Sequence, residues 1–241
     1  MADYPITPTI GILGGASNVA TGKMYARINA LSLPLLNETA EGLHIVQTLI
    51  AGMDFGVIEH AVREDNWSGL ANYMEAHLDR LSSADLIVCV SNTLHKDLGP
   101  IMAKRDQPFL HIAQPTADAI KHAGLSCVAL FGTKPVMSAD YMIQSYEAAG
   151  LKICVPTDQE QDDIDRIIFD ELCKFEIKEA SRQRYVEIAQ RLAREEGAQG
   201  IILGCTEIET LLRPNDIPEL PMFDTMELLC QGAVSAVLKS V

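Results

Sequence analysis

Short apolar runs alternate with longer amphipathic stretches from one end of the chain to the other. This alternation is typical of βαβ units, in which parallel strands are joined by helices. The runs are continuously apolar, as expected for strands that are buried on both faces of a parallel sheet. The predicted strands are Thr9–Leu13, His44–Ala51, Asp85–Val90, Cys127–Phe131, Ile153–Val155, Ile201–Leu203 and Met222–Asp224.

The amphipathic stretches predict helices, and some of their ends carry clear signals. Ser138 is placed as an N-cap, and Gly150 follows a helical pattern where a C′ glycine is expected. The mixed charges of Glu187–Glu196 predict a solvated helix face. The predicted helices are Ala20–Leu31, Trp67–Ser82, Thr93–Lys104, Pro115–Ala123, Ser138–Ala149, Gln159–Lys174, Glu179–Glu196 and Met226–Lys239.

A weak internal repeat divides the chain. The strand and turn at Ile10–Gly15 are followed by a second at Leu86–Thr93, and the later half repeats the scheme at Val128–Thr133 and Ile201–Thr206. We therefore expect two pseudo-symmetric three-layer α/β lobes with mostly parallel sheets. Ligands of open α/β sheets bind beyond the carboxyl ends of the strands. All four turns lie at such ends, so a cleft between the lobes is the predicted site.

The repeat also predicts where the lobes divide. We assign residues 1–114 to the first lobe and residues 115–223 to the second. The chain has 241 residues, 48% of them hydrophobic, which is enough for one large or two small domains with a core of their own.

Charge narrows the range of partners. The chain has 19 Lys and Arg against 33 Asp and Glu, a formal charge of −14. Such a charge argues against nucleic acid and against anionic membrane surfaces, although a local pocket can still bind a small anion. The sequence has no secretory signal and no apolar run of the roughly 20 residues that a membrane span needs. We expect a soluble cytoplasmic protein.

The six cysteines are scattered and contain no CxxC pair. This spacing argues against a zinc ribbon, a redox dithiol of the thioredoxin type and a disulfide scaffold, and we expect reduced thiols and no metal. Cys205 follows a predicted strand and precedes a predicted helix. A helix N-terminus favours the thiolate, which is a usable base or nucleophile. The alternative is that Cys205 is a small buried apolar residue.

The matching turn of the first lobe is Ser91-Asn92-Thr93-Leu94-His95. Asn92 and Thr93, with the backbone N–H groups of the next helix, form donors suited to a carboxylate. Simple helix capping is the alternative. His95 lies one turn beyond Ser91 and is placed as a base or a hydrogen-bond partner for it.

The turn Gly14-Gly15-Ala16-Ser17 matches neither GxGxxG nor a P-loop, so it gives little support for nucleotide binding. Its glycines let the backbone approach a small ligand. Lys134 lies in the related turn of the second lobe, where it supplies positive charge or is simply a solvated surface lysine.

These motifs together resemble the aspartate/glutamate racemase family. The resemblance rests on Gly11–Gly15, Ser91–His95, Gly204–Glu207 and Phe223–Thr225, and it spans nearly the whole chain in order. Further segments resemble the L-aspartate/glutamate branch of that family, namely Asp54-Phe55, His111–Ala113 and Ile168–Leu172.

The resemblance implies a racemase that needs no pyridoxal phosphate or other cofactor. It implies that Cys205 is one acid/base group and that Asn92, Thr93 and Thr206 bind the α-carboxylate. Gly14, Gly15 and Ser17 are the other expected substrate contacts, with His95 and Glu207 in support. It implies that the C-terminal helix packs back on the first lobe, so that residues 1–114 plus 224–241 form that lobe. It also implies a homodimer. The expected substrate is a small anionic amino acid such as aspartate or glutamate.

The main departure from the family pattern is Ser91, which stands where the family has its first cysteine. A hydroxyl is far less acidic than a thiol, so Ser91 needs help from His95 or water. Cys89 faces the same side but lies about 7 Å further back. We expect Cys205 to transfer a proton on one face and Ser91 on the other. A serine introduced to trap a substrate complex is the other explanation.

Smaller departures affect the substrate more than the reaction. Gln114 stands where relatives often have Asp, and Leu229 where they often have His. The residue that binds the substrate's side chain is not evident, and the candidates are Arg63, Lys96, Lys134 and Lys174. Two other functions stay open: a single-cysteine decarboxylase or isomerase of the same superfamily, and a binding protein for a dicarboxylate or amino acid that does not turn it over.

Overall fold

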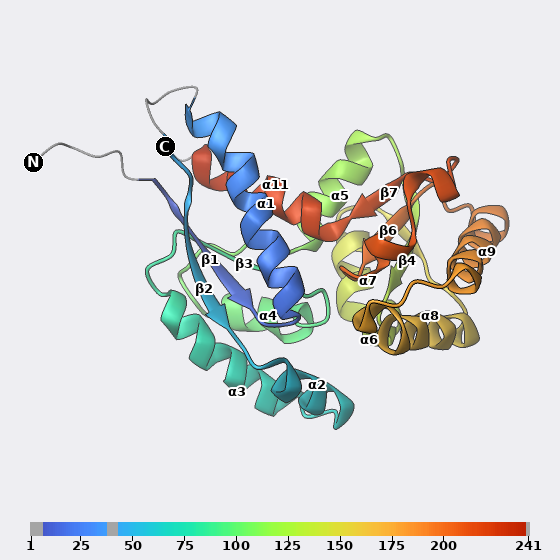
Figure 1. Cartoon of the computed structure of the whole chain (residues 1–241), viewed down its shortest axis with the longest axis horizontal. Helices are drawn as coiled ribbons and strands as arrows, with labels where there is room; N and C mark the ends of the chain where they lie inside the picture. The colour runs from blue at the N-terminus through green and yellow to red at the C-terminus, as the bar shows by residue number, and fades with distance from the viewer. Residues whose placement is uncertain (1–6, 38–42, 240–241) are drawn as a thin grey trace, which may run out of the picture. The chain divides into compact units, whose positions relative to one another are not determined.

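A computed structural model describes residues 7–37 and 43–239 and divides the chain into two compact units (Figure 1). The first unit comprises Met1–Ile112 with Leu229–Val241, and the second comprises Ala113–Leu228. Each unit has its own parallel sheet with helices packed against it, which confirms the predicted α/β class. No helix among the described residues is long and apolar enough to cross a membrane.

The sheet of the first unit has three parallel strands in the order β2-β1-β3. The strands are β1 (Thr9–Gly14), β2 (Gln47–Gly52) and β3 (Leu86–Cys89). Leu13 of β1 lies opposite Cys89 of β3. The turns after β1 and β3 therefore leave the sheet side by side at its carboxyl edge.

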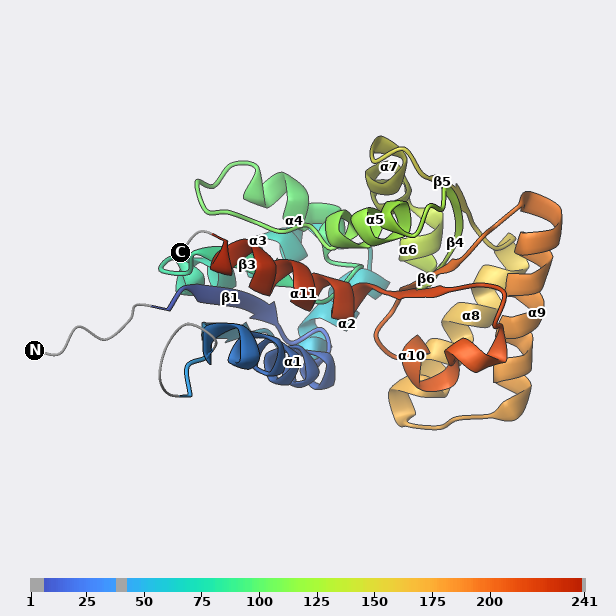
Figure 2. The same cartoon turned by 90° about the horizontal axis from the view of Figure 1, so that it is seen from above.

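Helices cover both faces of this sheet (Figure 2). α1 (Asn18–Asn37) lies on one face, and α3 (Trp67–Leu78) and α4 (His95–Met102) lie on the other. α2 (Phe55–Arg63) follows β2. The C-terminal helix α11 (Thr225–Leu238) belongs to this unit from Leu229 onward. Its Cys230 thiol contacts the carbonyl of Met24 in α1, which confirms that the helix packs on the first lobe.

The sheet of the second unit has four parallel strands in the order β5-β4-β6-β7. The strands are β4 (Cys127–Gly132), β5 (Lys152–Cys154), β6 (Ile201–Gly204) and β7 (Met222–Asp224). Gly132 lies opposite Gly204, and Leu203 lies opposite Asp224. The residues that follow β4, β6 and β7 therefore lie at the same edge of the sheet.

This second sheet is also covered on both faces (Figure 2). α8 (Asp158–Asp170) and α9 (Glu179–Glu196) pack on one face around Phe131 and Tyr185. α5 (Ala113–His122) and α7 (Asp140–Ala148) lie on the other. The short helices α6 (Lys134–Ser138) and α10 (Ile208–Leu211) follow β4 and β6 directly.

Several boundaries differ from the predicted ones. Helices α2, α6 and α10 were not predicted, because each spans nine residues or fewer and is too short to show a repeated helical period. Ser138 ends α6 instead of capping α7, since its hydroxyl donates to the carbonyl of Lys134. The prediction for Gly150 is confirmed: it has a φ of +87° just after α7, a conformation that favours glycine.

Candidate functional site

The Ser91 turn connects β3 to α4 in the first unit. β3 ends at Cys89, Asn92 to Leu94 form a turn, and α4 begins at His95. Ser91 and Thr93 are half-buried, and Asn92 is 4% exposed. α/β proteins bind ligands at the carboxyl edge of their parallel sheets, and this turn places polar residues at that edge. The structure thus brings Ser91, Asn92, Thr93 and His95 together as predicted.

His95 holds this turn in place through its backbone. The backbone N–H of Ile112 donates to Nε2 at 3.2 Å, so Nδ1 carries the proton and donates to the carbonyl of Ser91 at 2.8 Å. Burial, with a smaller contribution from the neighbouring His111, lowers the pKa of His95 to about 3. Both ring nitrogens are occupied and the ring stays neutral. Of the two roles predicted for His95, the structure shows the hydrogen-bond partner of Ser91, through the backbone carbonyl, and this contact is positional.

Cys89 is part of the core beneath the turn. It is 1% exposed and packs among the side chains of β3, α3 and α4. Burial raises the pKa of its thiol to about 12. A thiol in this environment is a core residue and does not replace the missing cysteine at position 91.

The glycine turn after β1 adjoins the Ser91 turn at the same sheet edge. Gly15 has a φ of +102°, and a Cβ there would overlap the backbone of Met53. The hydroxyl of Ser17 accepts from the N–H of Ala20 at 3.2 Å, as a cap of α1 does. The packing of β1 against Met53 therefore explains Gly15 without a ligand.

The Cys205 turn connects β6 to α10 in the second unit. The thiol of Cys205 donates to Oε2 of Glu207 at 3.1 Å, and the hydroxyl of Thr206 donates to the same oxygen at 2.7 Å. Cys205 is half-buried and packs on the core under α9. The structure therefore gathers Cys205, Thr206 and Glu207 around one carboxylate oxygen.

The electrostatics of this turn differ from the expected ones. Burial, followed by the negative charge of Glu207, raises the pKa of Cys205 well above its usual value. α10 has only four residues, so its N-terminus cannot outweigh a carboxylate in direct contact. The prediction that the helix N-terminus lowers the pKa of Cys205 is therefore wrong for the protein without a bound ligand. Cys205 rests as a thiol with an acceptor for its proton already in contact.

The cationic candidates all have partners within their own unit. Lys134 contacts Asp162, and Lys174 lies 3.6 Å from Asp170. Lys96 lies over the ring of Trp67, 3.5 Å from its centroid. Arg63 is 70% exposed and pairs with Glu59. Within residues 7–37 and 43–239, no three His, Cys, Asp or Glu side chains converge as they would to hold a metal ion.

Asp224 and Glu209 form a carboxyl pair that the sequence analysis missed. Asp224 ends β7 beside β6, and its Oδ1 accepts the N–H groups of Met226 and Glu227 at the start of α11. Burial and the hydrogen bond from Glu209 raise the pKa of Asp224 to about 7. An Asp between a strand and a helix is an N-cap signal, so the sequence could have predicted that Asp224 accepts the first N–H groups of α11. Nothing in the sequence points to Glu209.

This pair predicts a stability that falls as pH rises. The pKa of Asp224 is raised in the folded state, so its protonated form contributes stability that is present below about pH 4 and lost as pH rises through about 7. Asp224→Asn retains the cap and does not titrate. Its free energy of unfolding should gain on that of the parent by about 2 kcal/mol between pH 5 and pH 8, from the roughly 1.4 kcal/mol per pKa unit of such linkage. Urea unfolding at both pH values measures this difference.

The matched control is Glu219→Gln, which removes an exposed carboxylate of the same unit. Its unfolding curves should run parallel to those of the parent between pH 5 and pH 8. If Asp224→Asn also ran parallel to the parent, the two carboxyls would not share a proton in the folded state.

Comparison with known proteins supports one family throughout. The family model for Asp/Glu/hydantoin racemases matches residues 12–233. A Yersinia pestis structure, described as a candidate Asp/Glu racemase, is 32% identical, with 96% of this chain and 100% of that chain covered and a TM-score of 0.87.

Two more solved structures extend the comparison. An aspartate racemase homologue from Pyrococcus horikoshii is 28% identical, with 96% of this chain and 100% of that one covered and a TM-score of 0.76. A glutamate racemase from Francisella tularensis, in complex with D-glutamate, is 13% identical with a TM-score of 0.61, covering 97% of this chain and 82% of that one, and shares the fold. The chain therefore belongs to the Asp/Glu/hydantoin racemase family.

Proposed function

We propose that the protein is a cofactor-independent racemase that interconverts the L and D forms of aspartate, glutamate or a similar small amino acid. The observation that carries the proposal is the contact between the Cys205 thiol and Glu207 at the carboxyl end of β6. A thiol paired with a carboxylate is a proton-transfer unit that can act as acid or base. We also propose that the chain lies within the L-aspartate/glutamate branch.

Racemisation needs a base on one face of Cα and an acid on the other. The α-proton is very weakly acidic, so the base must lie close to it and the carboxylate must be held. In our proposal Glu207 takes the proton of Cys205, and the thiolate removes the α-proton. The ammonium group of a bound amino acid would favour this step, because a nearby positive charge lowers a thiol's pKa.

Ser91 is proposed as the group on the opposite face, supplying a proton with the help of water. Asn92, Thr93 and Thr206 would hold the α-carboxylate and stabilise the charge that grows on it as the carbanion forms. The backbone of Gly14 and Gly15, with Ser17, would line the same site. His95 supports this arrangement by fixing the carbonyl of Ser91.

The proposed function also indicates the ligand that the protein binds. The Francisella tularensis relative binds D-glutamate, which supports a small anionic amino acid as the ligand here. Lys134 and Lys174 remain the proposed contacts for its side chain. The six cysteines are all free thiols, in keeping with a reducing compartment, so we propose a cytoplasmic protein. A homodimer is proposed from the family resemblance alone.

Deuterium exchange at Cα tests the proposed function. We expect L- or D-aspartate or glutamate, incubated with the protein in deuterated water, to lose its α-proton signal by NMR while the opposite enantiomer accumulates. Chiral chromatography measures the second process. Absence of exchange with both enantiomers of a panel of small amino acids would refute the racemase proposal and leave ligand binding without turnover.

Ser91 also supports a second candidate, a one-sided enzyme in which a single thiol protonates an enediolate after decarboxylation. None of the described residues makes a hydrogen bond to the Ser91 hydroxyl that would activate it as a base. Product analysis separates the two candidates, because decarboxylation releases CO₂ and racemisation conserves mass.

A further inference from the structure

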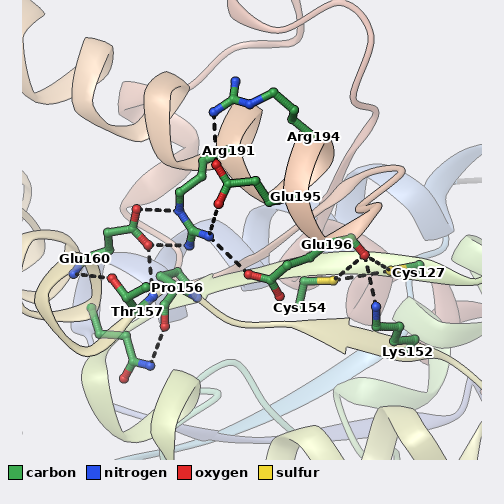
Figure 3. Close-up of polar contacts among 11 residues, drawn as sticks. Cys127, Lys152, Cys154, Pro156, Thr157, Glu160, Arg191, Arg194, Glu195 and Glu196 are labelled. Atoms are coloured by element: carbon green, nitrogen blue, oxygen red, sulfur yellow. Dashed lines mark hydrogen bonds and ion pairs between the residues drawn. The ribbon is translucent and has the colours of Figure 1, made fainter.

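Two cysteines lie in contact at the edge of the second sheet. Cys127 is the first residue of β4, and Cys154 is the last residue of the neighbouring strand β5. The strands are in parallel register with Cys127 opposite Lys152 and Ala129 opposite Cys154, so the two cysteines are diagonal neighbours on one face. Their Sγ atoms are 3.3 Å apart (Figure 3). Cys127 is half-buried and Cys154 is 1% exposed.

Both thiols point at the end of a helix. Each sulfur lies 3.8 Å from the carbonyl oxygen of Glu196, the last residue of α9, and Lys152 Nζ donates to the same oxygen at 3.0 Å (Figure 3). A helix C-terminus carries partial negative charge, which favours thiol over thiolate. Burial, with the neighbouring thiol, raises the pKa of Cys154 to about 12. Cys154 therefore rests as a thiol.

Charged side chains fix this helix end. Arg191 of α9 forms hydrogen bonds to both carboxylate oxygens of Glu160 in α8 and to Glu196 at 3.2 Å (Figure 3). Glu160 is itself part of a capping box with Thr157. The charged face of Glu187–Glu196, predicted to be solvated, therefore joins α9 to α8 at Arg191. These contacts fix the position of the carbonyl oxygen of Glu196 that both thiols contact.

The pair is separate from the proposed catalytic turn. β4 begins at Cys127 and ends at Gly132, which lies opposite Gly204, the residue before Cys205. At about 3.3 Å per residue, Cys127 lies about 16 Å along the sheet from that edge. Cys154 lies opposite Ala129 and is about 10 Å from it. The pair contributes nothing to proton transfer at Cα in the proposed reaction.

We propose that Cys127 and Cys154 are a modification site, at which hydrogen peroxide forms a reversible disulfide. Peroxide oxidises the more exposed Cys127 thiol to a sulfenic acid and releases one water. The sulfur of Cys154 then attacks the sulfenic sulfur, and the hydroxyl leaves with the thiol proton as a second water. Two thiols and one peroxide thus give one disulfide and two waters.

The bond requires a modest closure. The sulfurs must approach from 3.3 Å to about 2.05 Å. β5 is an edge strand of three residues, so it can shift to meet β4 without disturbing β6 or the Cys205 turn. The thiols donate toward Glu196 only in the reduced form, and the disulfide leaves Lys152 as the remaining donor to that carbonyl.

Peptide mapping of the full-length protein tests the proposal. Lys152 lies between the two cysteines, so trypsin places them on separate peptides. After treatment with hydrogen peroxide and blocking of free thiols with N-ethylmaleimide, we expect the two peptides to be joined, with the loss of two hydrogens. Dithiothreitol should separate them. The exposed Cys173 is the internal comparison and should stay unlinked.

Cys127→Ser and Cys154→Val serve as matched variants, each of which should abolish the joined peptides. The wild-type measurement stands even if the buried Cys154 variant folds poorly. If both thiols remain open to N-ethylmaleimide after oxidation, or if Cys127 advances to a sulfinic acid without a link, the proposed site does not exist. A link from Cys127 to Cys173 would overturn the proposed pairing.

Discussion

Cys205→Ala is expected to abolish racemisation, with a fall in rate of about 1,000-fold or more. General acid–base groups typically contribute 10² to 10⁴ in rate. This substitution removes the thiol and leaves the Thr206 hydroxyl as the remaining side-chain donor to Glu207. Exchange of the α-proton into deuterated water should fall by the same factor, since the same group removes that proton. Both rates are measured on one sample, exchange by NMR and inversion by chiral chromatography.

The matched control for this experiment is Cys173→Ala. Cys173 is an exposed thiol of the same unit, and its removal should leave both rates unchanged. The alternative is that Cys205 is only a core thiol, since it packs against the core of the second unit. A Cys205→Ala variant that retained the parent's exchange rate would show that this alternative is correct.

Much of the fold follows from the apolar pattern. β1, β3, β4 and β6 are short runs buried on both faces, so their centres were correctly predicted. β7 and α9 have the predicted limits. The apolar pattern fails for the shortest helices. α2 buries Ile58 and Ala61, but it has only nine residues and also exposes Phe55 and Val57, at 40% and 43%.

The members of the candidate site follow from the sequence, but their electrostatics do not. Cys205 and Ser91 lie at strand ends, where a pattern of strands places them. The pKa values depend on contacts that the sequence does not specify. Ile112 occupies a ring nitrogen of His95 from 17 positions away, and the carboxylate of Glu207 turns toward Cys205. Folding brings the partners of each group together, and the partners decide whether the group can act as a base.

Ser91 sets the weak side of the proposed reaction. Its hydroxyl has no hydrogen-bonded base among the described residues, and His95 is engaged through the backbone carbonyl. The enantiomer whose α-proton faces Cys205 should therefore exchange that proton with solvent faster than it inverts. Ser91→Ala should slow inversion further while leaving this exchange intact. If Ser91→Ala changed neither rate, Ser91 would not transfer the proton on the second face.

Ser91→Cys is expected to raise the rate of inversion by about 100-fold. A thiol is far more acidic than a hydroxyl, so the second face gains a group that can both give and accept a proton near neutral pH. The side chain is half-buried and nearly equal in size, so the turn should hold it without rearrangement. Because enantiomers have equal free energies, kcat/KM must rise equally in both directions, and exchange should become similar for both enantiomers. Initial rates of inversion from pure L and from pure D substrate measure this increase. An unchanged rate of inversion would show that proton transfer at position 91 does not limit the reaction.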